Sequence, residues 1–125
     1  MGRNTTTQIT LSEFTKKYID YFENDFGKTP EAYYRFFDNS TVPNECYQLG
    51  FEMDCGESFT KAFGNELWNT TEGLEEKVKG TTDIKMLGSA VFSQWRYYNH
   101  WADSHPSDEV KEWFLILLRR LKELC

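Results

Sequence analysis

Two apolar stripes with helical spacing, separated by a single proline, constrain the fold of this chain more than any other feature. The first stripe recurs every three or four residues, and its members are Ile84, Leu87, Val91, Trp95, Tyr98 and Ala102. The second has the same spacing, with Val110, Trp113, Phe114, Leu117, Leu121 and Leu124. Between them lies His105-Pro106, where helical geometry is disfavoured. The pattern predicts two long helices that form an antiparallel hairpin.

The ends of these two helices carry typical capping residues. Thr82 precedes the first helix and Ser107 the second, and both types of side chain accept hydrogen bonds from free backbone N–H groups. Acidic residues follow Ser107, and Arg119, Arg120 and Lys122 lie in the last turns, as the helix dipole favours. The run Trp113 to Leu118 is apolar around more than one face. It is therefore either buried centrally in the monomer or part of a homodimer contact through this C-terminal helix.

The first third of the chain predicts two more helices. Thr10 and Glu13 form a capping box, followed at helical spacing by Leu11, Phe14, Tyr18, Phe22 and Phe26, with Gly27 as the C-terminal cap. Thr29-Pro30 is typical of a helix start. The buried face of this shorter helix is Tyr33, Phe36 and Phe37, and Asn39-Ser40 ends it before Pro43.

Residues 44–69 follow no single period, because three glycines interrupt them. Phe59, Ala62 and Phe63 fit one short helix, whereas residues 50–53 suit an extended segment. Asn69-Thr70-Thr71 resembles the cap of another short helix, through Leu74 and Val78 to Gly80. We therefore expect an all-α fold: a compact single domain of five or six helices over residues 10–125, after a flexible N-terminal arm at residues 1–9.

Composition excludes several classes of protein. The chain has 125 residues, a net charge of −6 and 17% aromatic residues. The aromatic content argues against disorder, and the negative charge argues against direct binding of nucleic acid. The chain has no membrane-spanning run and no apolar leader, and its three cysteines are an odd number. We therefore expect a cytoplasmic protein with reduced thiols. No cofactor motif is recognisable.

The negative charge is concentrated in one part of the sequence. Residues 20–79 hold 13 acidic and five basic side chains, a net of −8, against +2 for the remainder. Such a segment predicts a face that docks a basic protein surface, including that of a nucleic-acid-binding protein. A solvated surface that keeps an aromatic domain soluble is the alternative. The candidate contact residues are Asp20, Glu23, Asp25, Glu52, Asp54, Glu57, Glu72, Glu75 and Glu76.

A second set of polar residues shares one face of the long helix around Trp95-Arg96-Tyr97-Tyr98. Its members, at three- and four-residue spacing, are Phe92, Arg96, Asn99, His100 and Asp103. A planar cation beside aromatic rings is suited to a nucleotide or another planar anion. The same groups also suit a satisfied polar network that fixes helix packing.

Catalytic and metal sites have little support. Cys55 would be an activated thiol if it lay at a helix N-terminus, but the only bases, His100 and His105, are far away in sequence. His100, Asp103 and His105 match no standard metal-ligand spacing. We therefore predict a non-enzymatic binding protein, of the inhibitor, immunity or anti-defence type of a bacterium or phage. The alternative is a receptor for a small, nucleotide-like molecule centred on Arg96.

Overall fold

The computed structural model describes residues 8–26, 28, 41–68, 70–101 and 108–125, and in residues 99–101 it describes the backbone only. These residues form six α-helices, a π-helical turn and a 3-10 turn, with no strand among them. The expectation of an all-α domain is confirmed. The helix predicted from Thr29-Pro30, with Tyr33, Phe36 and Phe37, lies outside the described residues, as do Gly27, Ala102, the His105-Pro106 break and the Ser107 cap.

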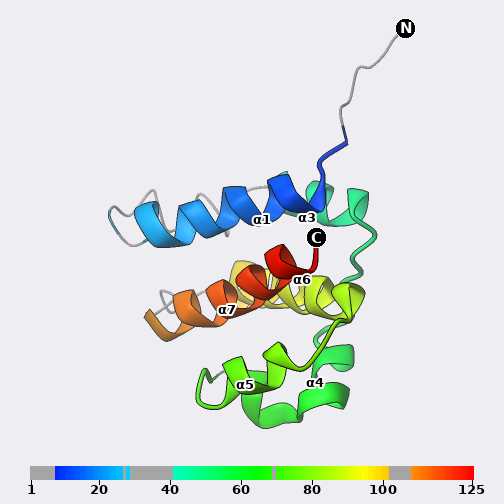
Figure 1. The fold of residues 1–125 in the computed structure, drawn as a ribbon, viewed down its shortest axis with the longest axis vertical. Coiled ribbons are helices and arrows are strands. Elements are labelled where there is room, and N and C mark those ends of the chain that lie inside the picture. Colours follow the sequence, from blue (N-terminus) through cyan, green and yellow to red (C-terminus); the bar gives the residue numbers. More distant parts are fainter. Residues whose placement is uncertain (1–7, 27, 29–40, 69, 102–107) are drawn as a thin grey trace, which may run out of the picture.

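The helices stack in three layers (Figure 1). Helices α6 (Ile84–Trp101) and α7 (Asp108–Leu124) form the central layer, with α1 (Leu11–Asp20) and α3 (Thr41–Gln48) on one side. On the other side lie α4 (Glu57–Phe63), the 3-10 turn η3 (Asn65–Trp68) and α5 (Leu74–Lys79). Arg120 Nε, late in α7, donates to the carbonyl of Thr81, just before α6. The two central helices therefore run antiparallel.

Helix α1 begins at the predicted capping box. The Thr10 hydroxyl accepts from the backbone N–H of Glu13, and the Glu13 carboxylate accepts from the backbone N–H of Thr10. The helix continues into the π-helical turn η2 (Tyr21–Asp25), where the Phe26 N–H donates to the Tyr21 carbonyl five residues earlier. Gln8 and Ile9, which the sequence assigned to the N-terminal arm, contact α3: the Gln8 side chain donates to the Gln48 carbonyl, and the Ile9 N–H donates to the Gln48 side chain.

Three other sequence predictions need correction. Helix α3 was not expected, because Pro43 suggested an end; Pro43 instead lies in the first turn, where a missing N–H costs no hydrogen bond. Helix α5 begins after Gly73 in a left-handed conformation, not at Thr70 or Thr71. At the start of α6, the side chain of Asp83, rather than that of Thr82, accepts from the backbone N–H of Met86.

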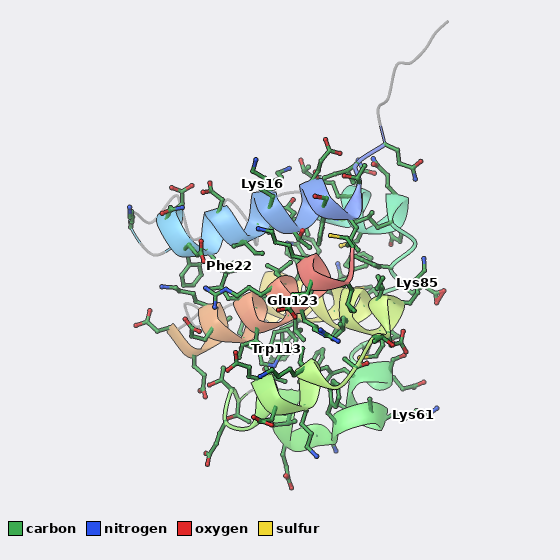
Figure 2. All side chains as sticks on the ribbon, viewed as in Figure 1. Lys16, Phe22, Lys61, Lys85, Trp113 and Glu123 are labelled. Atoms are coloured by element: carbon green, nitrogen blue, oxygen red, sulfur yellow. The ribbon has the colours of Figure 1, made fainter. Side chains whose placement is uncertain are left out.

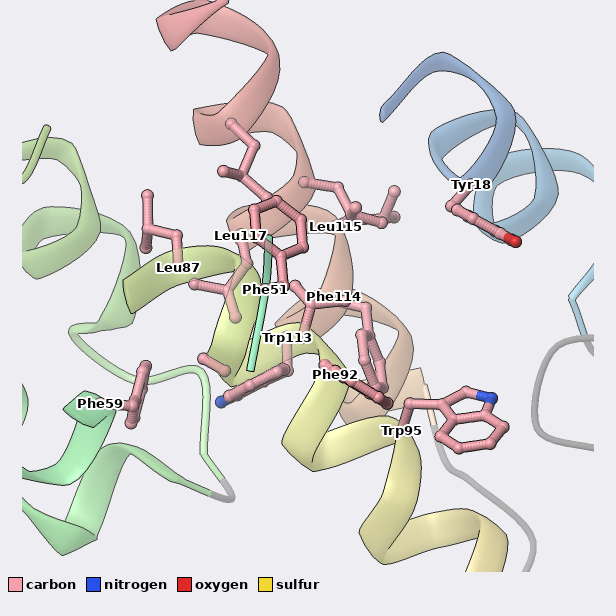
Figure 3. Close-up of a cluster of buried hydrophobic side chains, with 14 of the residues drawn as sticks. Tyr18, Phe51, Phe59, Leu87, Phe92, Trp95, Trp113, Phe114, Leu115 and Leu117 are labelled. Carbon is pink, nitrogen blue, oxygen red and sulfur yellow. The ribbon is translucent and has the colours of Figure 1, made fainter. Parts of the chain in front are cut away.

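A single core joins all three layers, and α7 lies at its centre (Figure 3). Trp113, Phe114, Leu115, Leu117 and Leu118 are all at most 1% exposed. The helix α7, which contains the apolar run from Trp113 to Leu118, is therefore buried centrally in the monomer. Phe114 stacks on Phe22 of η2 at a ring distance of 5.1 Å, so α7 anchors the first layer directly.

Candidate functional site: an acidic layer and its surroundings

The structure separates the nine predicted acidic contact residues into two groups. Asp20, Glu23 and Asp25 lie on α1 and η2, whereas the other six lie between residues 52 and 76. The central helices stand between the first group and the helices α4 and α5, which carry Glu57, Glu75 and Glu76 (Figure 1). The expectation of one acidic face over residues 20–79 is therefore corrected, because an unbroken sequence segment is folded around the core.

The first group is engaged in local contacts. The Glu23 carboxylate forms an ion pair with Arg119 of α7 at 2.9 Å, and Asp20 accepts from the Asn24 side chain at 2.8 Å. The Glu23–Arg119 pair ties η2 to α7. Both partners are about half exposed, so the pair adds at most about 1 kcal/mol to stability. Glu23 and Asp20 therefore have roles within the fold.

The second group belongs to what we call the acidic layer, residues 52–83. It holds eight carboxylates and three lysines, a net charge of −5 out of −6 for the chain. Among the described residues, no ion pair or hydrogen bond engages the exposed carboxylates of Glu57, Glu72, Glu75 and Glu76. Most of the net charge of the chain is thus held on residues 52–83, and these four carboxylates have no cationic partner among the described residues.

Asp54 differs from the rest of this group, because it anchors the start of α4. Its carboxylate accepts from the backbone N–H groups of Gly56 and Ser58 at 3.0 and 3.2 Å, and from the Ser93 hydroxyl at 3.2 Å. Partial burial alone would raise the pKa of Asp54. The hydrogen bonds from Ser58, Gly56 and Ser93 outweigh it, and the pKa lies below its ordinary value. Asp54 is thus a structural anchor.

A cleft of about 720 Å³ opens between α4, the start of α6 and the segment that contains Asp54. Its lining has both signs of charge: the acidic side chains are Glu52, Asp54 and Asp83, and the basic ones are Lys61 and Lys85. Figure 2 shows both lysines on the same side of the molecule. Lys85 is already engaged, because its ammonium group donates to the carbonyls of Leu49 and Gly50. The cleft is therefore polar and mixed in charge.

The structure splits the residue set predicted around Arg96. Phe92 is 1% exposed and packs in the core, so it does not stand beside Arg96 on an open face. Arg96 is exposed. Asp103 and the side chains of Asn99 and His100 lie outside the described residues. Of the predicted ligand-binding face, the described part thus retains Arg96 alone.

The thiol and metal hypotheses gain nothing from the described residues. Cys55 is exposed, with a left-handed backbone (φ 59°), and it precedes α4 by two residues. Among the residues that the structure describes, no three His, Cys, Asp or Glu side chains gather as metal ligands. His105 and Asp103 are outside this part of the chain. Within it, no helix is long and apolar enough to cross a membrane.

Two features escaped the sequence analysis. Glu45 is 8% exposed and accepts hydrogen bonds from the Tyr18 hydroxyl and from Lys17 Nζ, which joins α3 to α1. Nothing in the local sequence marks Glu45, since its partners lie 27 and 28 residues away. The second feature is that three large apolar side chains of the described residues, Tyr47, Met53 and Tyr97, are exposed.

Comparison of the chain with protein-family models, curated proteins and solved structures finds no match. The case for a function therefore rests on the geometry and charge of this chain alone.

Proposed function

We propose that this protein is a small, non-enzymatic binding protein whose acidic layer docks a basic surface of another protein. The observation that carries the proposal is the net charge of −5 on residues 52–83, with exposed carboxylates that have no cationic partner in the described part of the chain. Inhibitor, immunity and anti-defence proteins are the functional classes that suit a small acidic domain of this kind.

Electrostatics explains why such a layer favours a basic partner. Like charges held close together on one surface repel each other, and a complementary surface relieves this repulsion as it docks. The summed field also steers a basic partner during diffusion, which raises the association rate at low ionic strength. The relevant contact residues are those without a structural task, namely Glu57, Glu72, Glu75 and Glu76.

The experiment compares three forms of the protein as bait in lysate of the source cells, at low and high salt. The native chain is compared with the triple variant Glu57→Gln, Glu72→Gln, Glu76→Gln. The matched control removes three exposed carboxylates outside the layer, by Asp20→Asn, Asp108→Asn and Glu112→Gln. Neutral glutamine avoids placing a positive charge in the first turn of α4 or α5, where the helix dipole disfavours it.

We expect the native chain and the control to retain the same basic protein at low salt and to release it at high salt, as mass spectrometry will show. The layer variant should lose it. Two outcomes contradict the proposal: equal retention by the layer variant, or the absence of any salt-sensitive basic protein on the native bait.

A further inference from the structure

The cleft between α4 and the start of α6 is lined by opposite charges from two different elements. Glu52 belongs to the segment that runs beside α6, where its backbone N–H donates to the Ser89 hydroxyl at 3.0 Å. Lys61 belongs to the last turn of α4. A carboxylate and an ammonium group held by separate parts of the fold therefore line the same opening.

The other charged groups of this cleft have hydrogen-bond partners within the fold. Asp54 accepts from the Ser93 hydroxyl and from two backbone N–H groups at the start of α4. Asp83 accepts from the Met86 N–H at 3.0 Å. Lys85 donates to two carbonyls of the segment after α3. Asp54, Asp83 and Lys85 thus hold the lining of the cleft in place.

Glu52 and Lys61 have no such task. Both side chains are exposed, and among the described residues neither forms an ion pair or a side-chain hydrogen bond. Opposite charges that line one cleft without pairing with each other can each bind a ligand group of the opposite sign. A ligand that suits both carries a cationic group for Glu52 and an anionic group for Lys61.

The total charge of the lining narrows the class of ligand. Three carboxylates and two ammonium groups give it a net charge of −1, so a complementary ligand has more cationic groups than anionic ones. A phosphate would add negative charge to this excess, and a polyamine would leave Lys61 without a partner. Basic α-amino acids meet both conditions, because arginine and lysine have two cationic groups and one carboxylate at neutral pH.

We propose that this cleft binds a basic α-amino acid, with the side-chain cation at Glu52 and the carboxylate at Lys61. The planar guanidinium group of arginine presents paired N–H donors that match the two oxygens of a carboxylate. Met86 and Ala62 are the apolar side chains of the lining, and the methylene stem of the ligand packs against them. The volume of about 720 Å³ falls within the range of small-molecule sites.

This site is separate from the surface proposed to dock a basic protein. That surface uses Glu57, Glu72, Glu75 and Glu76, which are not among the lining residues of the cleft. The triple variant of the acidic layer (Glu57, Glu72 and Glu76 to Gln) should therefore bind the amino acid as the native chain does. Failure of one proposal is thus separable from failure of the other.

Titration of the native chain with L-arginine, followed by two-dimensional amide NMR, tests the proposal. The amides of Glu52, Lys61 and Ser89 should shift and saturate. The expected dissociation constant is about 1 mM, because the ligand has only about a dozen non-hydrogen atoms and the cleft is open. Glu52→Gln should raise this constant about fivefold, since one ion pair is lost.

Agmatine, which is arginine without its carboxylate, tests the role of Lys61. Lys61→Gln should raise the dissociation constant of arginine about fivefold but should not raise that of agmatine, which has no group for Lys61 to bind. Glu52→Gln should weaken both ligands. A purely structural role of Lys61 would change the two ligands alike.

Two matched controls remove one exposed charge of the same sign outside the cleft. They are Glu66→Gln for Glu52 and Lys77→Gln for Lys61, and each should leave the dissociation constant of arginine within about twofold of the native value. Circular dichroism confirms that each variant is folded.

Three outcomes overturn the proposal. The first is a native chain whose cleft amides show no saturable shift up to about 20 mM L-arginine. The second is a Glu52→Gln variant that binds arginine as tightly as the native chain. The third is a Lys61→Gln variant that loses affinity equally for arginine and for agmatine.

Discussion

The ring of Phe51 lies directly against the backbone of Gly88 in the second turn of α6. A Cβ atom at position 88 would fall 2.2 Å from the nearest ring carbons, far inside any van der Waals contact. Phe51 itself is 2% exposed and packs edge-on against Phe14 of α1. The segment after α3 can thus pack closely on α6 only because position 88 is a glycine, although glycine weakens a helix.

The first prediction concerns Gly88→Ala. In a free helix this change would stabilise by about 1 kcal/mol, because alanine has the higher helix propensity. Here the displaced Phe51 ring outweighs that gain, and we expect a net loss of about 1–3 kcal/mol in the free energy of unfolding. Gly80→Ala is the control: a Cβ there meets only the Lys77 carbonyl oxygen at 3.7 Å. Urea denaturation that finds both variants equally stable would contradict this account.

The helices that the sequence predicted correctly are those whose signals are local. The capping box of Thr10 and Glu13 and the apolar stripe of α6 need only neighbours within four residues, so α1 and α6 could be placed from the sequence. The packing of Phe51 on Gly88 joins residues 37 apart, and no periodicity reveals such a pair. The same holds for Glu45, whose partners Tyr18 and Lys17 come from another helix.

The second prediction concerns Asp54→Asn at the start of α4. Asparagine has one acceptor oxygen in place of two, so the backbone N–H of Gly56 or Ser58 loses its partner, which costs about 1 kcal/mol. The folded-state pKa of Asp54 lies below its unfolded value near 3.9. Ionised Asp54 therefore stabilises the fold fully above its unfolded pKa. This stabilisation disappears as the pH falls from the unfolded pKa to the folded pKa.

Denaturation at neutral and acidic pH checks this prediction. The loss of stability on acidification should be smaller in Asp54→Asn than in the native chain. Glu57→Gln, three residues along and exposed, is the matched control for the loss of one carboxylate in α4. If Asp54→Asn and the native chain respond identically to acid, the anchoring role of the carboxylate is wrong.

The third prediction concerns the only polar atom of the Trp113 side chain. Its Nε1–H donates to the backbone carbonyl of Leu67 at 2.9 Å, which ties η3 to α7. Trp113→Phe leaves this buried carbonyl without its donor and removes ring volume, and together these effects cost about 2–4 kcal/mol. Phe114→Leu is the control, since it reduces core volume without removing a hydrogen bond.

Hydrogen exchange distinguishes the two variants. In Trp113→Phe, amide protection should fall first in α4, for instance at the Gly64 N–H that donates to the Thr60 carbonyl, and less in α1. A uniform loss over both helices would show that the Trp113–Leu67 bond has no local role.

The candidate site could be predicted only as far as charge composition allows. The excess of acidic residues between 52 and 76 is visible in the sequence, and Glu57, Glu75 and Glu76 do lie in one layer, on α4 and α5. Their separation from Asp20, Glu23 and Asp25 depends on how α6 and α7 divide the molecule, which no local pattern encodes. Phe92 illustrates the same limit: helical spacing groups it with Arg96, but the Tyr47 ring and the core enclose it.

The last prediction concerns stability at high pH. Burial, together with the hydrogen bond to Glu45, raises the pKa of Tyr18, and burial with the neighbouring Glu45 carboxylate raises the pKa of Cys46. In the unfolded chain these groups titrate near 10 and 8.5. The folded state thus holds both protons more tightly than the unfolded state does. The resulting contribution to stability is complete below the two unfolded-state pKa values. As the pH rises above them, stability should fall by up to about 1.4 kcal/mol per pH unit for each group.

Urea denaturation from pH 7 to pH 11 measures this decline. The double variant Tyr18→Phe, Cys46→Ala removes both groups and should flatten the curve, even though it is less stable at pH 7 because Glu45 loses one donor. Cys55→Ser with Cys125→Ser is the matched control, because it replaces two exposed thiols outside the core. An equally steep decline in Tyr18→Phe, Cys46→Ala would locate the alkaline sensitivity elsewhere, with Tyr98, whose pKa partial burial also raises, as the next residue to change.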